Sequence, residues 1–316
     1  MGDGIYLVDA DYVRPRLAAI YIVEHQGRVA IIETGTNRSL PRVLDALDRL
    51  GLSVEDVDYV APTHVHLDHA GGAGAMIDRF PNAKLVIHPR GRRHMIDPAR
   101  LWLATIDVYG MDEATRLYGE ITPVPADRVV EAADGLEISL SGRTLRFLDT
   151  PGHARHHCCI VDIATRGIFT GDLFGMSYPE LDVEGRPSVM ITTTPTQFDP
   201  VAMKASLDRL LALRPPALYL THFSKVTDVD RLGAMLFGQL EAHVRVALEH
   251  SDLGGNERVT RITADLACYF QDERDRLGWR ISDREFEQIV MPDVRLNAKG
   301  LDAWIEQEQV AKGVLK

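Results

Sequence analysis

The stretch APTHVHLDHAGG, residues 61–72, places four side chains of metal-ligand type within six positions: His64, His66, Asp68 and His69. It follows an apolar run and precedes two glycines, so we predict a loop between a strand and a helix. In an extended loop alternate residues point the same way, so His64 and His66 can present two imidazoles to one ion, while Asp68 and His69 bend round to a second. A solvated surface loop explains so dense a cluster poorly, and the stretch predicts a pocket for two metal ions.

The composition limits the classes of function. With 316 residues, 45% of them hydrophobic, the chain can build one large domain, or one domain with an appendage. The formal net charge of -11 disfavours broad binding to nucleic acid or to anionic lipid. Three cysteines without a CxxC pair form no disulfide framework, and the sequence has neither a signal-peptide pattern nor a run of about 18 apolar residues. We therefore expect a cytoplasmic protein that acts on a small molecule and binds no nucleic acid and no membrane.

Short strands dominate the first part of the chain. Two apolar runs flank Gln26-Gly27, which is a hairpin signal. Apolar residues at helical spacing between Ser39 and Gly51 predict a helix. Residues 90–125 are less regular and look like an insertion with helical patches. The predicted strands are residues 4–10, 18–35 with its turn, 58–64 and 84–89.

The second half begins with strands and ends with helices. Strand patterns occupy residues 136–150, 157–163, 167–172 and 217–223, and we expect antiparallel pairing among them. Asp199-Pro200 predicts the start of a helix before the last strand. From Asp230 onward apolar residues recur at helical spacing. We predict a catalytic domain over residues 1–229 and a helical extension over 230–316, able to cover the mouth of the site or to form a homodimer.

Three further elements at strand ends carry chemistry. They are Pro151-Gly152-His153, Gly171-Asp172 and His222. Each is weak alone, because a single histidine after a strand is usually a hydrogen-bonded core or rim residue and Gly-Asp is usually a turn. Added to the first cluster, they supply two sets of ligands and one bridging carboxylate.

In this order the elements resemble the signature of the metallo-β-lactamase superfamily: THxHxDH, then PGH, then GD, then a histidine at a strand end, spread over residues 63–222. The resemblance implies an α+β fold, a four-layer αββα sandwich with the site at one edge of the two sheets, here followed by the helical C-terminal appendage. It also implies two ions, each held by three side chains and bridged by one carboxylate and a water or hydroxide: His64, His66 and His153 for the first, Asp68, His69 and His222 for the second, with Asp172 between them.

One position departs from the pattern of the superfamily. The segment IIETGTN has Glu33 where an Asp usually precedes Thr-Gly. We expect Glu33 to support the metal-binding loop through hydrogen bonds, although an ordinary carboxylate at a strand end is the alternative. Members of the flavodiiron type have Glu and Asp in the first cluster. His66 and His69 stand at those positions here, which favours hydrolysis.

The implied chemistry is hydrolysis by a metal-bridging hydroxide. Two divalent ions lower the pKa of a bridging water and polarise a carbonyl or phosphoryl oxygen. We assign Asp68 to orient the hydroxide and pass a proton to the leaving group, and Asp172 to set the spacing of the ions. The ligand set favours zinc, with iron or manganese as alternatives. The predicted substrate is a small ester, thioester or lactone.

Three residues are predicted to contact the substrate. His88 and Arg90 follow a strand whose end should lie near the site and could hold an anionic group, although a basic surface loop explains them equally well. Tyr178, shortly after Asp172, could donate a hydrogen bond to a carbonyl oxygen.

Two other functions remain open at this point. One is a mononuclear non-heme iron sulfur dioxygenase on the same fold. The other is a non-catalytic binding module, but the loss of ligands that would mark it is not seen. The segments expected to set specificity are residues 90–125, residues 174–195 and the C-terminal helices, and none of them carries a motif that identifies the substrate.

Overall fold

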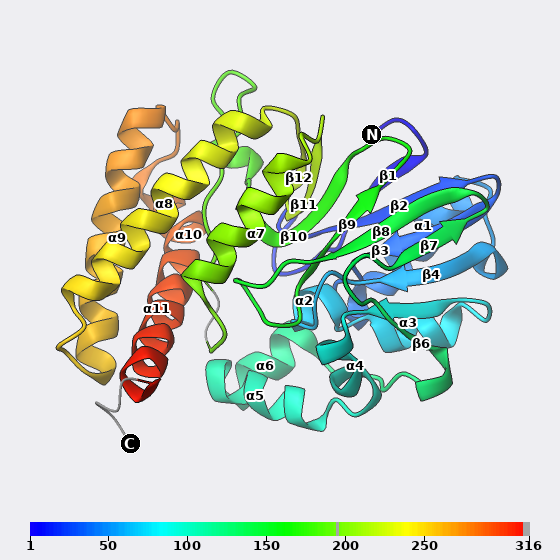
Figure 1. The fold of residues 1–316 in the computed structure, drawn as a ribbon, viewed down its shortest axis with the longest axis horizontal. Helices are drawn as coiled ribbons and strands as arrows, with labels where there is room; N and C mark the ends of the chain where they lie inside the picture. The colour runs from blue at the N-terminus through cyan, green and yellow to red at the C-terminus, as the bar shows by residue number, and fades with distance from the viewer. Residues whose placement is uncertain (194–195, 312–316) are drawn as a thin grey trace. The chain divides into compact units, whose positions relative to one another are not determined.

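The computed structural model describes residues 1–193 and 196–311 (Figure 1). They form two compact units, described separately below. Unit 1 comprises Met1–Thr150, His156–Gly171 and Pro215–Thr227, and unit 2 comprises Pro151–Arg155, Asp172–Arg214 and the chain from Asp228 onward. This division does not coincide with the predicted boundary between residues 229 and 230, which stays a prediction.

The first sheet of unit 1 is mixed. Its strands lie in the order of the sequence, and β1 to β3 are antiparallel while β3 to β6 are parallel. The predicted hairpin is confirmed: His25 pairs with Arg28, and both Gln26 and Gly27 have positive φ, as the mirror-image turn of a two-residue hairpin requires. The six strands are β1 (Ile5–Asp9), β2 (Ala19–His25), β3 (Arg28–Ile32), β4 (Val57–Ala61), β5 (Lys84–Ile87) and β6 (Val129–Glu131).

Helices connect the parallel strands, because a parallel pair cannot be joined by a tight turn. The predicted first helix is confirmed as α1 (Leu40–Arg49), and the motif is followed by α2 (Leu67–Ala70) and α3 (Ala73–Arg79). The insertion is more regular than its sequence pattern suggests, since it folds into α4 (Pro89–Ile96), α5 (Ala99–Tyr109) and α6 (Met111–Tyr118).

The second sheet contains the remaining strands, in the order β12-β11-β10-β9-β8-β7. The predicted antiparallel pairing is confirmed for β7 with β8, β8 with β9, and β9 with β10. The short strands β6 and β12 were not predicted. The bounds are β7 (Glu137–Leu140), β8 (Arg143–Asp149), β9 (Cys158–Asp162), β10 (Ile168–Met176), β11 (Leu218–His222) and β12 (Ser224–Val226).

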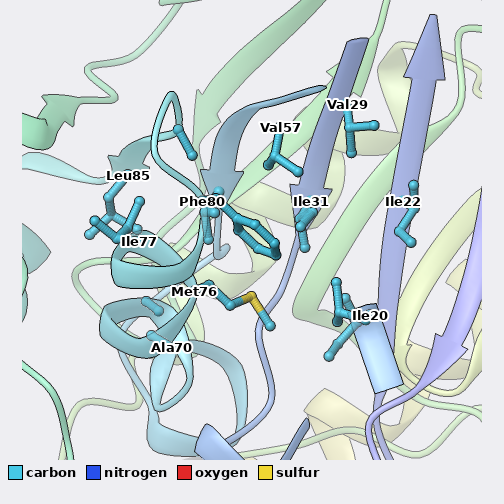
Figure 2. Packing of buried hydrophobic residues seen from close by; sticks show 14 of the residues in the cluster. Ile20, Ile22, Val29, Ile31, Val57, Ala70, Met76, Ile77, Phe80 and Leu85 are labelled. Carbon is cyan, nitrogen blue, oxygen red and sulfur yellow. The ribbon is translucent and has the colours of Figure 1, made fainter. Parts of the chain in front are cut away.

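Two apolar clusters explain how unit 1 is layered. Successive side chains on a strand point to opposite faces, so each strand of the first sheet contributes to both clusters. Figure 2 shows the cluster between this sheet and its helices, in which Ile20, Ile22 and Ile31 face Met76 and Phe80. The second cluster lies between the two sheets and includes Tyr21, Ala30, Phe147, Ile160, Phe169 and Tyr219. Unit 1 is thus a stack of helices, sheet and sheet.

Unit 2 is mostly helical. Its helices are α7 (Pro200–Ala212), α8 (Val229–Glu249), α9 (Gly255–Leu277), α10 (Asp283–Ile289) and α11 (Met291–Ala311). Asp199 caps α7 as predicted, because its Oδ1 accepts hydrogen bonds from the amides of Val201 and Ala202. The predicted helical character of the C-terminal part is confirmed over the residues described. None of the helices in the described part of the chain is long and apolar enough to span a membrane.

Two buried amides join the segment that follows β10 to the helices of unit 2. Gln239 of α8 accepts from the amide of Ile191 at 2.7 Å and donates to the carbonyl of Val189 at 2.7 Å. Asn297 of α11 accepts from the amide of Thr193 at 2.8 Å and donates to the carbonyl of Ile191 at 2.9 Å. Both amide side chains are about 1% exposed. The helices therefore supply the hydrogen bonds that this irregular segment cannot make within itself.

Candidate metal centre

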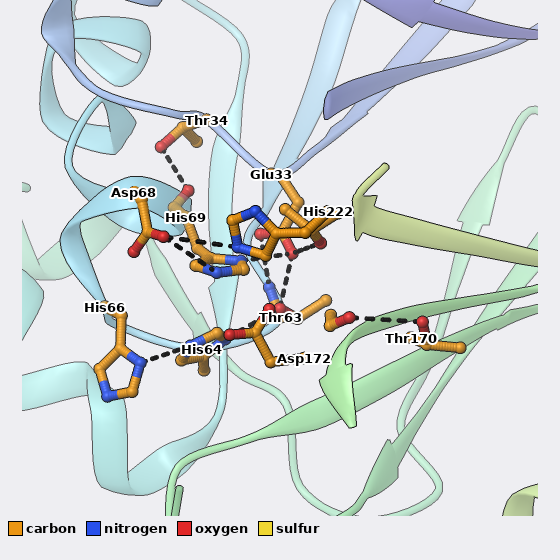
Figure 3. A network of polar contacts seen from close by, with 12 residues as sticks. Glu33, Thr34, Thr63, His64, His66, Asp68, His69, Thr170, Asp172 and His222 are labelled. Carbon is orange, nitrogen blue, oxygen red and sulfur yellow. Dashed lines mark hydrogen bonds and ion pairs between the residues drawn. The ribbon is translucent and has the colours of Figure 1, made fainter. Parts of the chain in front are cut away.

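Five of the seven predicted ligands lie in unit 1. Four are on the loop and short helix that follow β4, and His222 is the last residue of β11 (Figure 3). The side chains of His64 and His69 are fully buried, and Asp68 is half-buried. The two segments are far apart in sequence, and the fold places their polar ends side by side.

Asp68, His69 and His222 form a compact ligand group. Their ligand atoms all lie within 4.8 Å of one another. Oδ2 of Asp68 is 3.7 Å from Nε2 of His69 and 3.5 Å from Nε2 of His222. Two imidazole nitrogens and a carboxylate oxygen around one point are a donor set that fits a divalent ion such as zinc. These are the three residues predicted to hold the second ion.

The opposite ring nitrogens of two histidines are held by acceptors. Nδ1 of His69 donates to Oε1 of Glu33 at 3.0 Å, and Nδ1 of His222 donates to the carbonyl of Leu17 at 2.8 Å. Because each acceptor has no hydrogen to give, the proton of a neutral imidazole stays on Nδ1 and the lone pair of Nε2 faces Asp68. Ligating histidines in metal sites are typically oriented in this way.

His64 is held in the same tautomer by a longer chain of hydrogen bonds. Oγ1 of Thr63 donates its hydrogen to Oε1 of Glu33 at 2.6 Å. Thr63 Oγ1 is therefore left to accept a hydrogen bond from Nδ1 of His64 at 3.1 Å. The lone pair of His64 is then on Nε2, which lies 2.8 Å from Nδ1 of His66. Two ring nitrogens converge here, as the alternation along the loop predicts.

Glu33 connects three segments of unit 1. Besides Thr63 Oγ1 and His69, its carboxylate accepts from the amide of Thr63 at 3.1 Å and from Oγ1 of Thr221 at 2.8 Å. The residue is buried, and its φ of +66° lies in the left-handed region, which a non-glycine residue adopts at an energetic cost. The expectation that Glu33 supports the loop is confirmed, and its reach to β11 is a finding that the sequence did not reveal.

The backbone of the loop is fixed from the adjacent strand end. The amide and Oγ1 of Thr34 both donate to the carbonyl of His69 at 2.7 Å, and the amide of Gly72 donates to Thr34 Oγ1 at 3.1 Å. Sequence reasoning missed Thr34, although its place directly after Glu33 in ETG was a usable signal. It missed Leu17 as well, and a backbone carbonyl leaves no signal in the sequence.

Gly171 shows why the second half of the pattern contains Gly-Asp. Its φ is +49°, and a Cβ at this position would lie 2.4 Å from Oγ1 of Thr63 and 2.5 Å from Nε2 of His157. Only glycine allows β10 to pass so close to the threonine that orients Glu33 and His64. The pair is therefore more than a simple turn.

The other two predicted ligands, His153 and Asp172, belong to unit 2. Nε2 of His153 lies 3.3 Å from Oδ2 of Asp172, and both side chains are buried. Gly152, just before His153, has φ +135°, and its carbonyl accepts from the amide of Asp199. A Cβ on Gly152 would lie 2.2 Å from Cα of Met203, so the PGH segment packs directly against the start of α7.

Two of the three predicted substrate contacts, His88 and Tyr178, have side-chain partners of their own. His88 caps α4, because Nδ1 accepts from the amide of Arg90 at 3.1 Å, and Nε2 lies 3.2 Å from Oδ1 of Asp149. Burial lowers the pKa of His88 despite that carboxylate. Tyr178 is buried in unit 2 and donates to Oδ2 of Asp293 at 3.0 Å. Substrate binding by His88, Arg90 and Tyr178 stays a prediction.

Comparison with protein families gives one match of wide extent. Residues 13–222 match the model of the metallo-beta-lactamase superfamily. This range covers about two thirds of the chain and includes the seven predicted ligands.

Individual relatives share less than a third of their residues with this chain over the matched lengths. A metallo-beta-lactamase fold-containing protein of Sulfurisphaera tokodaii, ST1585, is 26% identical over 224 residues, which cover 69% of this chain and 78% of that protein. A hydroxyacylglutathione hydrolase of Aeromonas hydrophila is 29% identical, over 64% of this chain and 60% of that protein. An acyl-coenzyme A thioesterase of Gallus gallus, MBLAC2, is 29% identical, over 55% of this chain and 64% of that protein.

Solved structures share the fold. The crystal structure of ST1585, an archaeal metallo-beta-lactamase superfamily protein, superposes with a TM-score of 0.64 at 22% identity, over 95% of this chain and 99% of that one. The predicted α+β fold class, with two sheets, helices and a helical C-terminal region, is confirmed.

Proposed function

The chain belongs to the metallo-β-lactamase superfamily and is a metal-dependent hydrolase, and we propose that it uses two divalent ions to hydrolyse a small ester, thioester or lactone. The observation that carries this proposal is the group formed by Asp68, His69 and His222. Its histidines are held through Nδ1 by Glu33 and Leu17, so their Nε2 atoms are prepared for a cation.

We propose that His153 and Asp172 complete the site from unit 2. Chain connectivity supports this. Asp172 directly follows Gly171 of unit 1, which packs on Thr63, the residue before His64. In the sequence His153 follows Thr150 by three residues and precedes His156 by three, and both of those residues belong to unit 1.

The protein's own residues would then divide the work of hydrolysis. Two bound divalent ions would supply a water of lowered pKa and a polarised carbonyl oxygen. Asp68, the least buried member of its group, would accept a proton from the attacking water and return it to the leaving oxygen or sulfur. Glu33 would keep the imidazole of His69 from rotating, and Asp172 would lie between the two ligand sets.

We propose zinc as the metal, with iron or manganese as the alternatives, because the unit 1 set is rich in imidazole and contains one carboxylate. The relatives support hydrolysis over the alternative, a sulfur dioxygenase with a single iron. One is named a hydroxyacylglutathione hydrolase and another an acyl-coenzyme A thioesterase. A thioester is accordingly the first substrate class to test.

The proposed function is tested by turnover with matched variants. Zinc-loaded protein is assayed on acyl-coenzyme A and acyl-glutathione thioesters, aryl and alkyl esters, and lactones. We expect one class to be hydrolysed, and Asp68→Asn and His69→Ala to lose at least 100-fold in kcat/KM. His25→Ala, which changes the histidine beside the β2–β3 turn, serves as the control. A protein that carries both ions and hydrolyses nothing in this panel would contradict the proposal.

The remaining interaction predictions are also proposals. We propose that the chain binds no nucleic acid, since its net charge is -11, and that its C-terminal helices are able to form a homodimer. Light scattering coupled to size exclusion measures the mass directly. A peak near the 35.2 kDa of a single chain at micromolar concentration would rule the dimer out.

A further inference from the structure

Two tyrosines that sequence analysis passed over meet in unit 1. Tyr12 lies on the loop between β1 and β2, and Tyr118 is the last residue of α6, in the insertion. The hydroxyl of Tyr12 donates to the hydroxyl of Tyr118 at 3.1 Å. Their rings are stacked with centroids 5.8 Å apart, and the edge of Tyr109 packs on Tyr118 with centroids also 5.8 Å apart. The pair is thus held both by its ring faces and by its polar ends.

The loop that carries Tyr12 also touches the ligand group. The loop is closed by a hydrogen bond from the amide of Ala10 to the carbonyl of Ala18. Leu17, within this loop, is the residue whose carbonyl holds Nδ1 of His222. The loop that bears Tyr12 therefore also holds one ring nitrogen of His222.

The end of the helix that carries Tyr118 contacts the segment that follows Glu33 and Thr34. Arg38 donates to the carbonyl of Arg116 at 2.8 Å, and the side-chain amide of Asn37 donates to the carbonyl of Glu120. Arg38 and Asn37 follow closely on Glu33 and Thr34, which bond His69. The two segments that carry the tyrosines therefore contact His222 itself and the segment that follows Glu33 and Thr34.

Electrostatics agree with this position. Burial, followed by the nearby Asp68 carboxylate, raises the pKa of Tyr12 well above its usual value. Burial, then Tyr12, then Asp68 raise the pKa of Tyr118 in the same direction. Both phenols are therefore neutral hydrogen-bond donors throughout the physiological pH range. The Asp68 carboxylate therefore lies within electrostatic reach of both phenols.

We propose that the hydroxyl pair of Tyr12 and Tyr118 is the subsite that receives an acyl oxygen of the substrate, which is the carbonyl oxygen of an ester or thioester and a carboxylate oxygen of the product. Tyr12 donates to Tyr118, and within the described part of the chain the hydroxyl hydrogen of Tyr118 has no acceptor, so it is available to a ligand. This inference rests on the proposed function, because it places the acyl group of that substrate next to Asp68.

The chemistry of the pair explains why tyrosines suit this place. A cationic donor would form an ion pair with Asp68 and compete with the metal for it, whereas a phenol donates a hydrogen bond without bringing a charge. A donor that itself accepts a hydrogen bond is polarised and donates more strongly. The insertion, expected from the sequence to set specificity, supplies Tyr118, the more buried member of the pair.

Binding of hexanoate to the zinc-loaded full chain tests the subsite without requiring turnover. Calorimetric titration compares the wild type with Tyr12→Phe, Tyr118→Phe and the double variant. Tyr59→Phe is the control, since it removes a hydroxyl from β4 of the same unit. We expect each single variant to weaken binding about 10- to 100-fold, as the loss of one hydrogen bond to a charged group does. The double variant should lose less than twofold more, because the hydroxyls act as one chain.

Three results would overturn the proposal. The first is a wild type that does not bind hexanoate at millimolar concentration. The second is a pair of single variants whose Kd stays within twofold of the wild type. The third is loss of zinc from either single variant, because the pair would then be a support of the metal site. The turnover assays described under the proposed function distinguish a failure of this subsite from a failure of the proposed hydrolysis. If no substrate is turned over, the proposed hydrolysis fails while the binding data still decide the role of the tyrosines.

Discussion

Glu33 and His69 are joined by a hydrogen bond of 3.0 Å between Oε1 and Nδ1, and the same carboxylate oxygen accepts from Thr63 at 2.6 Å and from Thr221 at 2.8 Å. One buried acid therefore sets the tautomer of a ligand, the position of the loop after β4 and the end of β11. From the end of β3 this carboxylate therefore contacts both the metal-binding loop and β11.

Replacing Glu33 with glutamine tests this relationship. An amide has a single acceptor oxygen and directs an N–H group toward groups that must themselves donate, so at least one contact becomes repulsive. We expect zinc affinity to fall about 10- to 100-fold, measured by competition with a chelating dye. Glu137→Gln, which changes an exposed carboxylate paired with Arg146, should leave the affinity unchanged. Equal affinities in the two variants would mean that Glu33 does not support the ligands.

Substituting Gly171 with alanine should damage the site through Thr63. The new methyl group would be 2.4 Å from Thr63 Oγ1, so β10 or the loop must shift. We expect a loss of roughly 1–3 kcal/mol in unfolding free energy and weaker zinc binding. Gly238→Ala in α8, where a Cβ meets nothing within 4 Å, is the matched control and should be neutral or stabilising. If Gly171→Ala behaves like Gly238→Ala, the close packing at Thr63 is not real.

The buried amides of unit 2 give a stability prediction. Asn297→Ala leaves the amide of Thr193 and the carbonyl of Ile191 without their partner, so we expect about 1–3 kcal/mol lower unfolding free energy by urea denaturation. Asn256→Ala, at an exposed position at the start of α9, should change stability by less than about 0.5 kcal/mol. Similar small effects in both variants would show that the amide does not hold the segment after β10.

His243 predicts a pH dependence of stability. Burial lowers its pKa from 6.5 to about 4, although the carbonyl of Gln239 at 2.8 Å acts in the opposite direction. Between pH 6.5 and 4 the unfolded chain binds a proton at this residue and the folded chain does not, so the free energy of unfolding falls as the pH is lowered through that window. Above pH 6.5 His243 contributes no pH dependence to the stability. The full effect is about 3 kcal/mol.

The pH effect of His243 can be isolated from that of the other histidines by comparing slopes. Urea denaturation of the wild type and His243→Asn is measured from pH 7.5 to pH 4.5, and the variant should have the shallower loss of stability toward low pH. Parallel curves for the two proteins would contradict the assignment.

Local patterns made part of this architecture predictable. The ligand loop could be placed because an apolar strand, a ligand cluster and two glycines follow one another within residues 57–72. The hairpin at Gln26-Gly27 and the cap at Asp199 were predictable for the same reason, since each is decided by the conformational preferences of a few adjacent residues. The assignment of residues to two ions came only from the resemblance to a family.

Contacts between distant segments were not predictable. Glu33 and Thr221 are 188 positions apart, and Tyr12 and Tyr118 are 106 apart, so no periodicity of the sequence links them. The helices of the insertion were underestimated because α5 has no fully buried residue, and its pattern therefore lacks a clear apolar stripe. The short strands β6 and β12 have three residues each, which is too few for an alternation to be recognised.

The central claim is that the chain holds a pair of divalent ions. Elemental analysis of the full chain, loaded with zinc and then freed of excess metal by gel filtration, measures this most directly. The account predicts two zinc ions per chain in the wild type and about one in His69→Ala, which lacks a ligand of one set only. A wild type that retains no zinc, or that binds a single iron when purified without added metal, would contradict it.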